Sequence, residues 1–503
     1  MTGGRKASGA LSAGLDWEAI DWPTIHKTVL RLQMRIAKAE KAGRHGKAQA
    51  LQHLLVHSFF AKLWAVRRVT MNRGKNTPGV DKVVWKTPGQ RLQAARSMGV
   101  GGDREYRPQP LRRIYIPKKN GKRRPLGIPT MIDRAMQALH LLGLNPIAEV
   151  RADPNSYGFR PHRSTADALG ECFCVFAKKN SPTVVLDADI KSCFDRISHA
   201  WLIAHVPMDK AILRKWLAAG FVEDKVLHRT DEGTPQGGII SPVLANLTLD
   251  GLERVAREAA PRRSLVNVVR YADDFLVTAR TPELLSTKIV PAIVAFLAER
   301  GLELSSEKTR ITDVGTGFDF LGATIRKYGG TLLMKPSRKS VKTFLDGIRG
   351  HIKAHAGHSL KDLLRLINPR IRGWANYFRG LVASRVFCKV DSAIFDAMVR
   401  WMRRRHPKKG LAWLRTRYFR RDGLRNWTVT TSVRRRDGSR EHLDLFRAAS
   451  VPIRRHVKVR ADATAFDPAY RAYFQQRRKN RGRRFAEVDV LPWPRTSRQP
   501  RPR

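Results

Sequence analysis

The tetrapeptide YADD, residues 271–274, stands between two apolar, β-branched runs, SLVNVVR before it and FLVTAR after it. Such runs predict strands, and a short connection between two strands predicts a hairpin. A tight turn between paired strands would hold Asp273 and Asp274 together at the surface of a sheet. Adjacent acids are also ordinary turn formers, so this motif alone leaves a purely structural role open.

A second pair of carboxylates lies in the apolar run VVLDADI, residues 184–190. Successive side chains of a strand point to opposite faces. The residues therefore divide into a core face (Leu186, Ala188, Ile190) and an acidic face (Val185, Asp187, Asp189). Two like charges on one face need water, a cation or a basic partner. The spacing does not distinguish Asp187 from Asp189.

The rest of the chain is strongly basic, with 96 Lys and Arg against 43 Asp and Glu and a net charge of +53. This excess indicates a polyanionic partner, and nucleic acid is the obvious one. Basic proteins of the ribosomal type are usually short, whereas 503 residues with 42% hydrophobic content predict folded machinery of several domains. Carboxylates that hold two Mg²⁺ ions inside a cationic shell suit nucleotidyl transfer, because the lysines and arginines bind phosphates.

The cysteines Cys172, Cys174, Cys193 and Cys388 form no CxxC pair, so neither a zinc knuckle nor a disulfide framework is expected. This usage fits a reducing compartment. The opening residues contain no continuous apolar segment, and no run of about 18 uncharged apolar residues occurs. We therefore expect a cytoplasmic protein that does not enter a membrane.

Periodicity divides the chain coarsely. Residues 17–70 predict two helices with a break near residues 43–46. Residues 111–129 predict a basic hairpin with its tip at 118–122, and strands alternate with helices up to a boundary near 332.

Helices dominate from there to about residue 405. The last 103 residues carry 30 Lys and Arg and 8 Asp and Glu, a difference of +22, and end in a basic tail that we expect to be disordered.

A series of blocks occurs in a fixed order along the chain: AVRRVTMNRGKNTPGVD, YRPQPLRRIYIPKKNGKRRPLGIPTMIDRAMQ, YGFRPHRSTADAL, VVLDADIKSCFDRISH, GTPQGGIISPVLANLTLD, RYADDFLVTA, GLELSSEKT, FDFLGATI and INPRIRGWANYFR. These blocks lie between residues 65 and 379, and the resemblance covers about residues 17–380. They resemble the reverse transcriptases encoded by group II introns, which are also called maturases.

The resemblance implies an α+β fold of the right-hand polymerase type, with fingers, an antiparallel palm sheet and a helical thumb. The domains would be an N-terminal helical extension (1–72), fingers and palm (73–332), thumb or maturase domain X (333–410) and a basic nucleic-acid-binding region with a tail (411–503).

The resemblance also implies roles for individual residues. Asp189, Asp273 and Asp274 match the catalytic carboxylates that hold two Mg²⁺ ions with the Ile190 carbonyl, and Asp187 remains the runner-up. Lys308 matches a lysine that protonates the leaving pyrophosphate.

Other matching positions form the nucleotide pocket: Arg112, Lys118 and Arg124 for the triphosphate, Phe194 as the steric gate against a ribose 2′-hydroxyl, and Gln236 with Gly237 in a pocket loop. A solvated charge run is the alternative for each cation, and a core aromatic is the alternative for Phe194.

On the thumb, Arg372, Trp374, Tyr377 and Arg379 match residues that bind RNA. Cations suit phosphates and rings suit base stacking. However, Trp374, Tyr377 and Phe378 fall at helical spacing, so a thumb core is an equal reading of the rings.

The implied function is an RNA-directed DNA polymerase that binds its group II intron RNA in a ribonucleoprotein, assists splicing and copies the intron from dNTPs into a target DNA. A splicing-only maturase and a reverse transcriptase working outside an intron, in defence or with a CRISPR system, are the alternatives.

Many relatives continue into an HNH endonuclease with CxxC pairs, but no cysteine follows Cys388. We therefore expect no endonuclease activity. DNA synthesis would then be primed from another source, such as a nascent strand. The basic residues 403–484 are expected to bind DNA or RNA.

Overall fold

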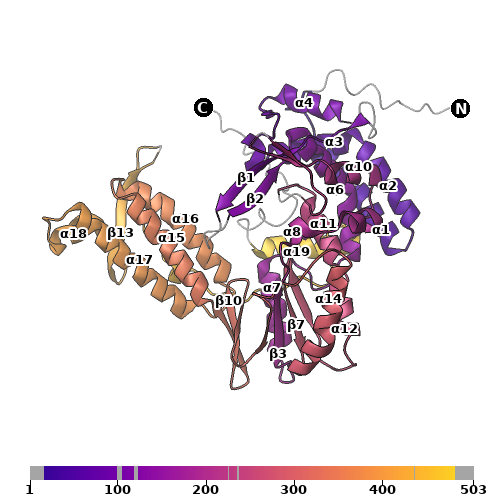
Figure 1. The fold of residues 1–503 in the computed structure, drawn as a ribbon. Coiled ribbons are helices and arrows are strands. Elements are labelled where there is room, and N and C mark those ends of the chain that lie inside the picture. Colours follow the sequence, from indigo (N-terminus) through magenta and orange to yellow (C-terminus); the bar gives the residue numbers. More distant parts are fainter. Residues whose placement is uncertain are drawn as a thin grey trace. The chain divides into compact units, whose positions relative to one another are not determined.

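The computed structural model describes residues 16–98, 105–117, 123–224, 226–234, 237–435 and 437–481. The chain packs into two units (Figure 1). Unit 1 comprises Met1–Ala168, Leu186–Arg310 and Val459–Arg503, and unit 2 comprises Leu169–Val185 and Ile311–Lys458. A short segment before the first acidic strand thus belongs to unit 2, and the described residues from Val459 onward belong to unit 1.

Unit 1 begins with three helices rather than the two expected. The apolar residues Ile25, Val29 and Ile36 give the first helix a buried face. The second break comes at Ser58, whose backbone is extended. The helices of this unit are α1 (Trp22–Lys41), α2 (His45–His57), α3 (Phe59–Thr70), α4 (Pro88–Ser97), α6 (Met131–Arg151), α8 (Cys193–Arg196), α9 (His199–His205), α10 (Lys210–Leu217), α11 (Ser241–Leu249), α12 (Leu252–Glu258), α13 (Pro282–Leu284) and α14 (Val290–Ala298), with α19 (Arg471–Arg481) from the C-terminal segment. Helix α7 (Thr165–Phe176) starts in unit 1 and continues into unit 2.

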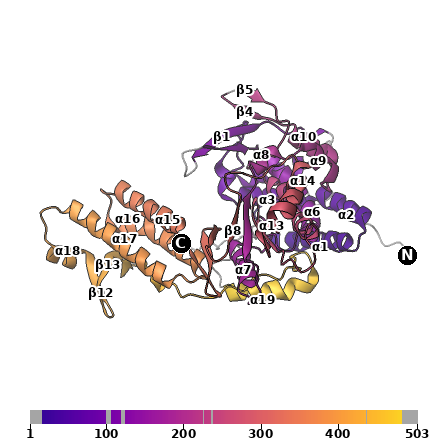
Figure 2. The same cartoon turned by 60° about the horizontal axis from the view of Figure 1, so that its bottom comes forward.

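Two four-stranded sheets are formed wholly or largely by residues of unit 1. The first has the order β2-β1-β4-β5 and is formed by β1 (Leu111–Pro117), β2 (Arg123–Ile128), β4 (Phe221–Glu223) and β5 (Val226–His228). Figure 2 shows β1, β4 and β5 side by side. Strands β1 and β2 pair antiparallel, which confirms the basic hairpin, although its tip lies outside the described residues.

The second sheet has the order β6-β7-β3-β8, from β3 (Val184–Asp189), β6 (Val268–Tyr271), β7 (Asp274–Ala279) and β8 (Arg310–Asp313). Figure 1 shows β3 beside β7, with α12 and α14 next to them. The antiparallel pair β6 and β7 confirms the hairpin expected around YADD.

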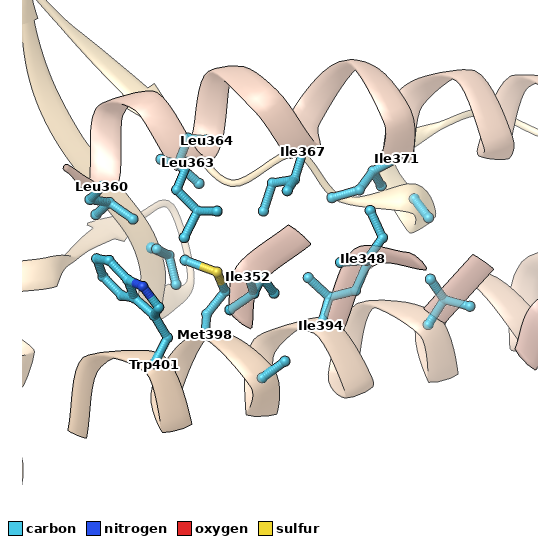
Figure 3. Close-up of a cluster of buried hydrophobic side chains, with 14 of the residues drawn as sticks. Ile348, Ile352, Leu360, Leu363, Leu364, Ile367, Ile371, Ile394, Met398 and Trp401 are labelled. Atoms are coloured by element: carbon cyan, nitrogen blue, oxygen red, sulfur yellow. The ribbon is translucent and has the colours of Figure 1, made fainter. Parts of the chain in front are cut away.

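Unit 2 combines two small sheets with a helical bundle. Strands β9 (Phe318–Phe320), β10 (Ala323–Tyr328) and β11 (Thr331–Pro336) form an antiparallel meander. Helices α15 (Arg338–Ala354), α16 (Leu360–Phe378) and α17 (Ser384–Arg405) follow, and the side chains of Ser337 and Ser359 cap the first two by accepting backbone N–H groups. Apolar residues from all three helices meet in one core (Figure 3), including Ile348, Ile352, Leu363, Ile367, Ile371, Ile394 and Met398.

A helix and a sheet that the sequence pattern did not predict complete unit 2. Helix α18 (Leu411–Tyr418) runs into β12 (Phe419–Asp422), which pairs with β13 (Arg425–Arg434), and β13 pairs with β14 (Arg440–Asp444). Within the described ranges, no helix has both the length and the apolar character needed to cross a bilayer.

Candidate active site

The acidic strand β3 has the two faces that its alternation predicts. Leu186, Ala188 and Ile190 are buried, whereas Asp187 and Asp189 are half-buried. Val185 departs from the expected pattern because it is also fully buried. The core side of the strand therefore anchors the two carboxylates at the border between protein and solvent.

The YADD motif forms a two-residue turn, since Tyr271 pairs with Asp274 across the hairpin. Ala272 adopts a φ of +59°, a left-handed conformation that costs a non-glycine residue about 1–2 kcal/mol. Gly158 packs directly against this turn, and a Cβ at Gly158 would lie 2.3 Å from Ala272 N. Only glycine at position 158 permits this close approach.

Backbone hydrogen bonds bring three distant segments together. Ile190 N donates to Asp273 O (3.3 Å), which joins the end of β3 to the YADD turn. Ser305 N donates to Asp189 O (2.8 Å), and Lys191 N donates to Glu303 O (2.9 Å). The motifs DIKSCFD, YADD and SSEKT therefore converge at one place.

The carboxylates repel one another. Burial raises the pKa of Asp273, and repulsion from Asp189 adds to this effect. Burial also raises the pKa of Asp274 to about 7, followed by repulsion from Asp187, Asp189 and Asp273. Among the charged neighbours, Asp187, the runner-up of the acidic strand, contributes most to the raised pKa of Asp274.

Lys308 supplies positive charge to this cluster. Its Nζ donates to Asp189 Oδ2 at 2.5 Å, and its own pKa is raised chiefly by that hydrogen bond. The lysine side chain is 62% exposed. The ammonium is thus protonated and lies beside the carboxylate, which is where an acid for the leaving group would have to be.

The donor set suits divalent cations. Carboxylate oxygens are the ligands that Mg²⁺ prefers, and a bound cation would offset the burial and repulsion that raise the pKa values of Asp273 and Asp274. Among the described residues, no three carboxylate, imidazole or thiolate groups are already arranged to hold an ion. Because Lys308 contacts Asp189, this lysine has to give way before that carboxylate can ligate a metal fully.

The basic hairpin presents its predicted cations on one face. Arg112 pairs with Ile128 and Arg124 pairs with Ile116, and opposite residues share a face. The guanidinium Nε of Arg112 donates to Pro78 O (3.1 Å), whereas Arg124 is exposed and lowers the pKa of Asp273 by its charge. Lys118 lies outside the described residues.

The pocket loop reaches the same face of the hairpin. Gly237 has a φ of +119°, and a Cβ there would lie 2.6 Å from Gly127 O and 3.1 Å from the Leu126 side chain. Leu126 lies on the face that carries Arg112 and Arg124. The structure thus brings Gly237 to the cations, while Gln236 lies outside the described residues.

Phe194 is half-buried on the one-turn helix α8, just after the acidic strand. Its carbonyl accepts a hydrogen bond from Thr234 N (2.6 Å), which fixes it to the loop that leads to Gly237. Its ring meets the Phe159 ring edge to face, with centroids 6.1 Å apart. Phe194 therefore lies at the border of the protein, shortly after the acidic strand, rather than in the deep core.

Sequence reasoning missed two supports of the site. Arg270, 1% exposed, forms a buried ion pair with Asp250 and donates to Asn246 Oδ1 (3.3 Å). Phe159, in the loop that contacts YADD, was not singled out either. A charged residue inside the apolar run VNVVRY was the available signal for Arg270, because a buried charge needs a partner.

The four thumb positions lie on α16 and at its end. Trp374 stacks on Phe344 (4.7 Å between centroids) and packs against the helical core, so the core reading applies to this ring. Tyr377 is 41% exposed and donates its hydroxyl to Leu321 O (2.9 Å).

The two thumb arginines differ in their surroundings. Arg372 is exposed, with its guanidinium 4.6 Å from the Phe446 ring centroid. Arg379 is half-buried and lies near Asn376.

Three family models match the chain: "Reverse transcriptase (RNA-dependent DNA polymerase)" over residues 116–325, "N-terminal domain of reverse transcriptase" over 17–98, and "Group II intron, maturase-specific domain" over 341–419. The reverse transcriptase match contains the three carboxylates, Lys308 and Phe194. The maturase match contains the four thumb positions.

Curated relatives are similar to this chain over long stretches. Protein YkfC of Escherichia coli (strain K12) is 32% identical over 300 residues, which cover 51% of this chain and 78% of that protein. The group II intron-encoded protein LtrA of Lactococcus lactis subsp. cremoris is 32% identical over 312 residues, 49% of this chain and 51% of that protein. The chain thus spans about half the length of LtrA.

A solved telomerase from Candida albicans, in complex with a fragment of telomeric RNA, aligns with a TM-score of 0.34 at 14% identity over 59% of this chain and 60% of that chain.

Proposed function

Since this chain belongs to the family of group II intron-encoded reverse transcriptases and maturases, we propose that it copies its own intron RNA into DNA and binds that RNA to assist splicing. The family's polymerases depend on divalent metal ions. In this chain the ions would be two Mg²⁺, the template the intron RNA, the substrates dNTPs, and the destination of the copy a target DNA.

The observation that carries the polymerase proposal is the convergence of three segments: backbone hydrogen bonds join the end of β3 to Asp273 and to Ser305, and the Lys308 side chain donates to Asp189. Asp189, Asp273 and Asp274, with the Ile190 carbonyl, would hold the ions, which supply activation of the primer hydroxyl and stabilisation of charge on the phosphates.

The protein's own side chains and backbone bind the nucleotide, select its sugar and protonate the leaving group. Arg112 and Arg124 bind the triphosphate through the shared face of the hairpin, and Gly237 lets the pocket loop approach closely. Phe194 excludes a 2′-hydroxyl, and the Lys308 ammonium donates its proton to the departing pyrophosphate.

A basic and aromatic surface of unit 2 supports RNA binding. Residues 400–435 contain 13 Lys and Arg and one acid, Asp422. Trp413 and Trp427 are 37% and 41% exposed, and each lies near a cation, Lys409 at 5.8 Å and Arg415 at 5.5 Å. Cations and exposed rings together suit a structured RNA, whose phosphates and unpaired bases they contact.

The test is a pair of assays on the parent and Asp273→Ala: primer extension on an RNA template, and splicing of the intron RNA. We expect extension to fall at least about 10³-fold, because the site loses a metal ligand, and splicing to be unchanged. The matched control is Glu258→Gln, which removes an exposed acid of unit 1 on α12 and should leave both activities intact.

The outcomes separate the candidate functions. A parent that supports splicing but does not extend a primer would be a splicing-only maturase. A parent that extends a primer but neither binds the intron RNA in preference to unrelated RNA nor promotes its splicing would be a reverse transcriptase working outside an intron.

A further inference from the structure

Residues 459–478, which we call the C-terminal strap, return to unit 1 and pack on the loop at residues 155–167. Figure 2 shows α19, whose residues 471–478 belong to the strap, along the lower side of unit 1 in that view. The strap carries its own apolar anchors, and Val459, Ala463, Phe466 and Phe474 are all at most 5% exposed. This burial makes it an integral part of unit 1 rather than a loose tail.

The contacts between strap and loop are charged and directional. Asp167, which is fully buried, accepts from Val459 N (2.8 Å) and Arg477 Nη2 (3.0 Å). Arg163, 3% exposed, donates through Nη2 to Ala461 O (2.9 Å) and Ala463 O (3.2 Å). Buried charges are tolerated only when partners compensate them, so loop and strap depend on each other.

The loop needs such support because it is strained. Phe159 and His162 have φ values of +59° and +60°, and such conformations persist only where the surroundings enforce them. The His162 ring stacks on Phe474 of the strap, with centroids 4.5 Å apart and planes inclined by 26°. The strap thus touches one of the two strained residues directly.

The other end of the same loop supports the catalytic turn. Tyr157 N donates to Arg270 O (2.8 Å), and Arg270 N donates to Asn155 O (3.0 Å). Gly158 fits against Ala272, and the Phe159 ring borders the Phe194 ring. Unit 1 therefore has a continuous series of contacts from the strap through the loop to the YADD turn and the steric gate.

We propose that the C-terminal strap is a positioning element of the polymerase site, which holds the loop at 155–167 in the conformation that supports the YADD turn and places Phe159 against Phe194. No strap residue needs to touch the substrate. The catalytic consequence rests on the proposed function, whereas the structural support of the turn does not.

The test uses the full chain with Arg477→Gln, its conservative counterpart Arg477→Lys, and Phe474→Leu. Lys41→Gln is the matched control, because it breaks an exposed ion pair between α1 and the strap residue Asp467 (3.2 Å) without touching the loop. Circular dichroism and thermal melts verify that each variant is folded before it is compared.

Hydrogen exchange of the free protein gives the first readout. In Arg477→Gln and Phe474→Leu we expect exchange to rise about tenfold or more in the strap, in residues 155–167 and at the amides of Tyr157 and Arg270. Arg477→Lys should restore most of the protection, and Lys41→Gln should not change exchange in the loop. A rise confined to residues 459–481 would overturn the proposal.

Single-nucleotide extension gives the second readout. We expect kcat to fall about 10- to 100-fold, as small displacements near a reacting centre do, and the preference for dNTPs over rNTPs to weaken. The KM for primer–template should be unchanged. Unchanged kcat and unchanged sugar preference despite faster exchange at Arg270 would also overturn the positioning role.

An inactive parent would instead contradict the proposed function. In that case the exchange measurement alone decides whether the strap supports the turn.

Discussion

Lys308 Nζ lies 2.5 Å from Asp189 Oδ2. The ammonium group is therefore hydrogen-bonded to an oxygen of the carboxylate that we assign to metal binding. This pair joins two roles in the proposed reaction, since the lysine is also the candidate acid for pyrophosphate. Its presence predicts a competition between lysine and metal at Asp189.

Lys308→Gln should therefore bind Mn²⁺, as a probe for Mg²⁺, more tightly than the parent when no nucleotide is present. An ion pair as exposed as this one is worth at most about 1 kcal/mol, or about fivefold in affinity. The same variant should lose about 10²- to 10⁴-fold in kcat, the usual contribution of a general acid. Electron paramagnetic resonance of Mn²⁺ and single-turnover extension measure the two effects.

Lys191→Gln is the control for this prediction, because it removes a neighbouring exposed lysine that pairs with Glu303 (3.5 Å). Equal Mn²⁺ affinity in parent and Lys308→Gln would show that the lysine does not compete.

The raised pKa of Asp274, about 7, predicts how the metal-free protein responds to pH. A carboxyl with a higher pKa in the folded than in the unfolded state binds more protons when folded, so stability falls as pH rises from about 4 through about 7. Asp274→Asn should not lose stability in this way, because its side chain does not ionise. In EDTA its Tm should exceed that of the parent at pH 8, and the difference should shrink as the pH falls and vanish at about pH 4.

Mg²⁺ should reduce that difference by stabilising the ionised carboxylate in the parent. A parent and variant whose Tm values run parallel from pH 5 to pH 8 would contradict the assignment of the raised pKa.

Phe194→Val should weaken the rejection of ribonucleotides. In the proposed role of Phe194 as steric gate, removing the ring opens the space where a 2′-hydroxyl would clash, and shape selection of this kind is worth about 10- to 200-fold. The ratio of kcat/KM for a dNTP and its rNTP measures the change. Phe221→Val, which removes a ring that lies 3.7 Å from the Arg113 guanidinium elsewhere in unit 1, should keep the parent's ratio.

The thumb predictions separate packing from RNA contact. Trp374→Ala should lower the free energy of unfolding by about 3 kcal/mol, because it empties a site in the helical core. Trp374→Phe should recover much of that loss. RNA affinity of the folded fraction should be the same in all three proteins.

Arg372→Gln should affect RNA binding rather than stability. Stability should be nearly unchanged because the residue is exposed, while intron RNA affinity should fall and its dependence on salt should drop by about one phosphate contact. Filter binding at several salt concentrations tests this, and an unaltered slope would exclude Arg372 from the RNA contact.

Local patterns predicted the secondary structure around the site but not its assembly. Alternation in VVLDADI gave the two faces of β3, and the runs around YADD gave the hairpin, because both follow from a period of two residues. The hydrogen bond between Ile190 and Asp273 joins segments 83 residues apart, which no local pattern encodes. The family resemblance supplied that relationship.

The misses also have physical causes. Ser58 is compatible with a helix, so its extended backbone could not be read from periodicity, and two helices were expected where three occur. The hairpin of β12 and β13 had a signal, Asp422-Gly423, a dipeptide that favours tight turns, but the dense arginines around it indicated only a basic surface.

The hydrogen bond from Ser305 N to Asp189 O spans 116 residues of chain, and this spacing orders events on the ribosome. A nascent chain emerges from its N-terminus and folds as it appears, so β3 and the YADD hairpin can form well before residue 305 is available. Until the SSEKT segment has been synthesised, the carboxylates would lack the contacts that this segment provides.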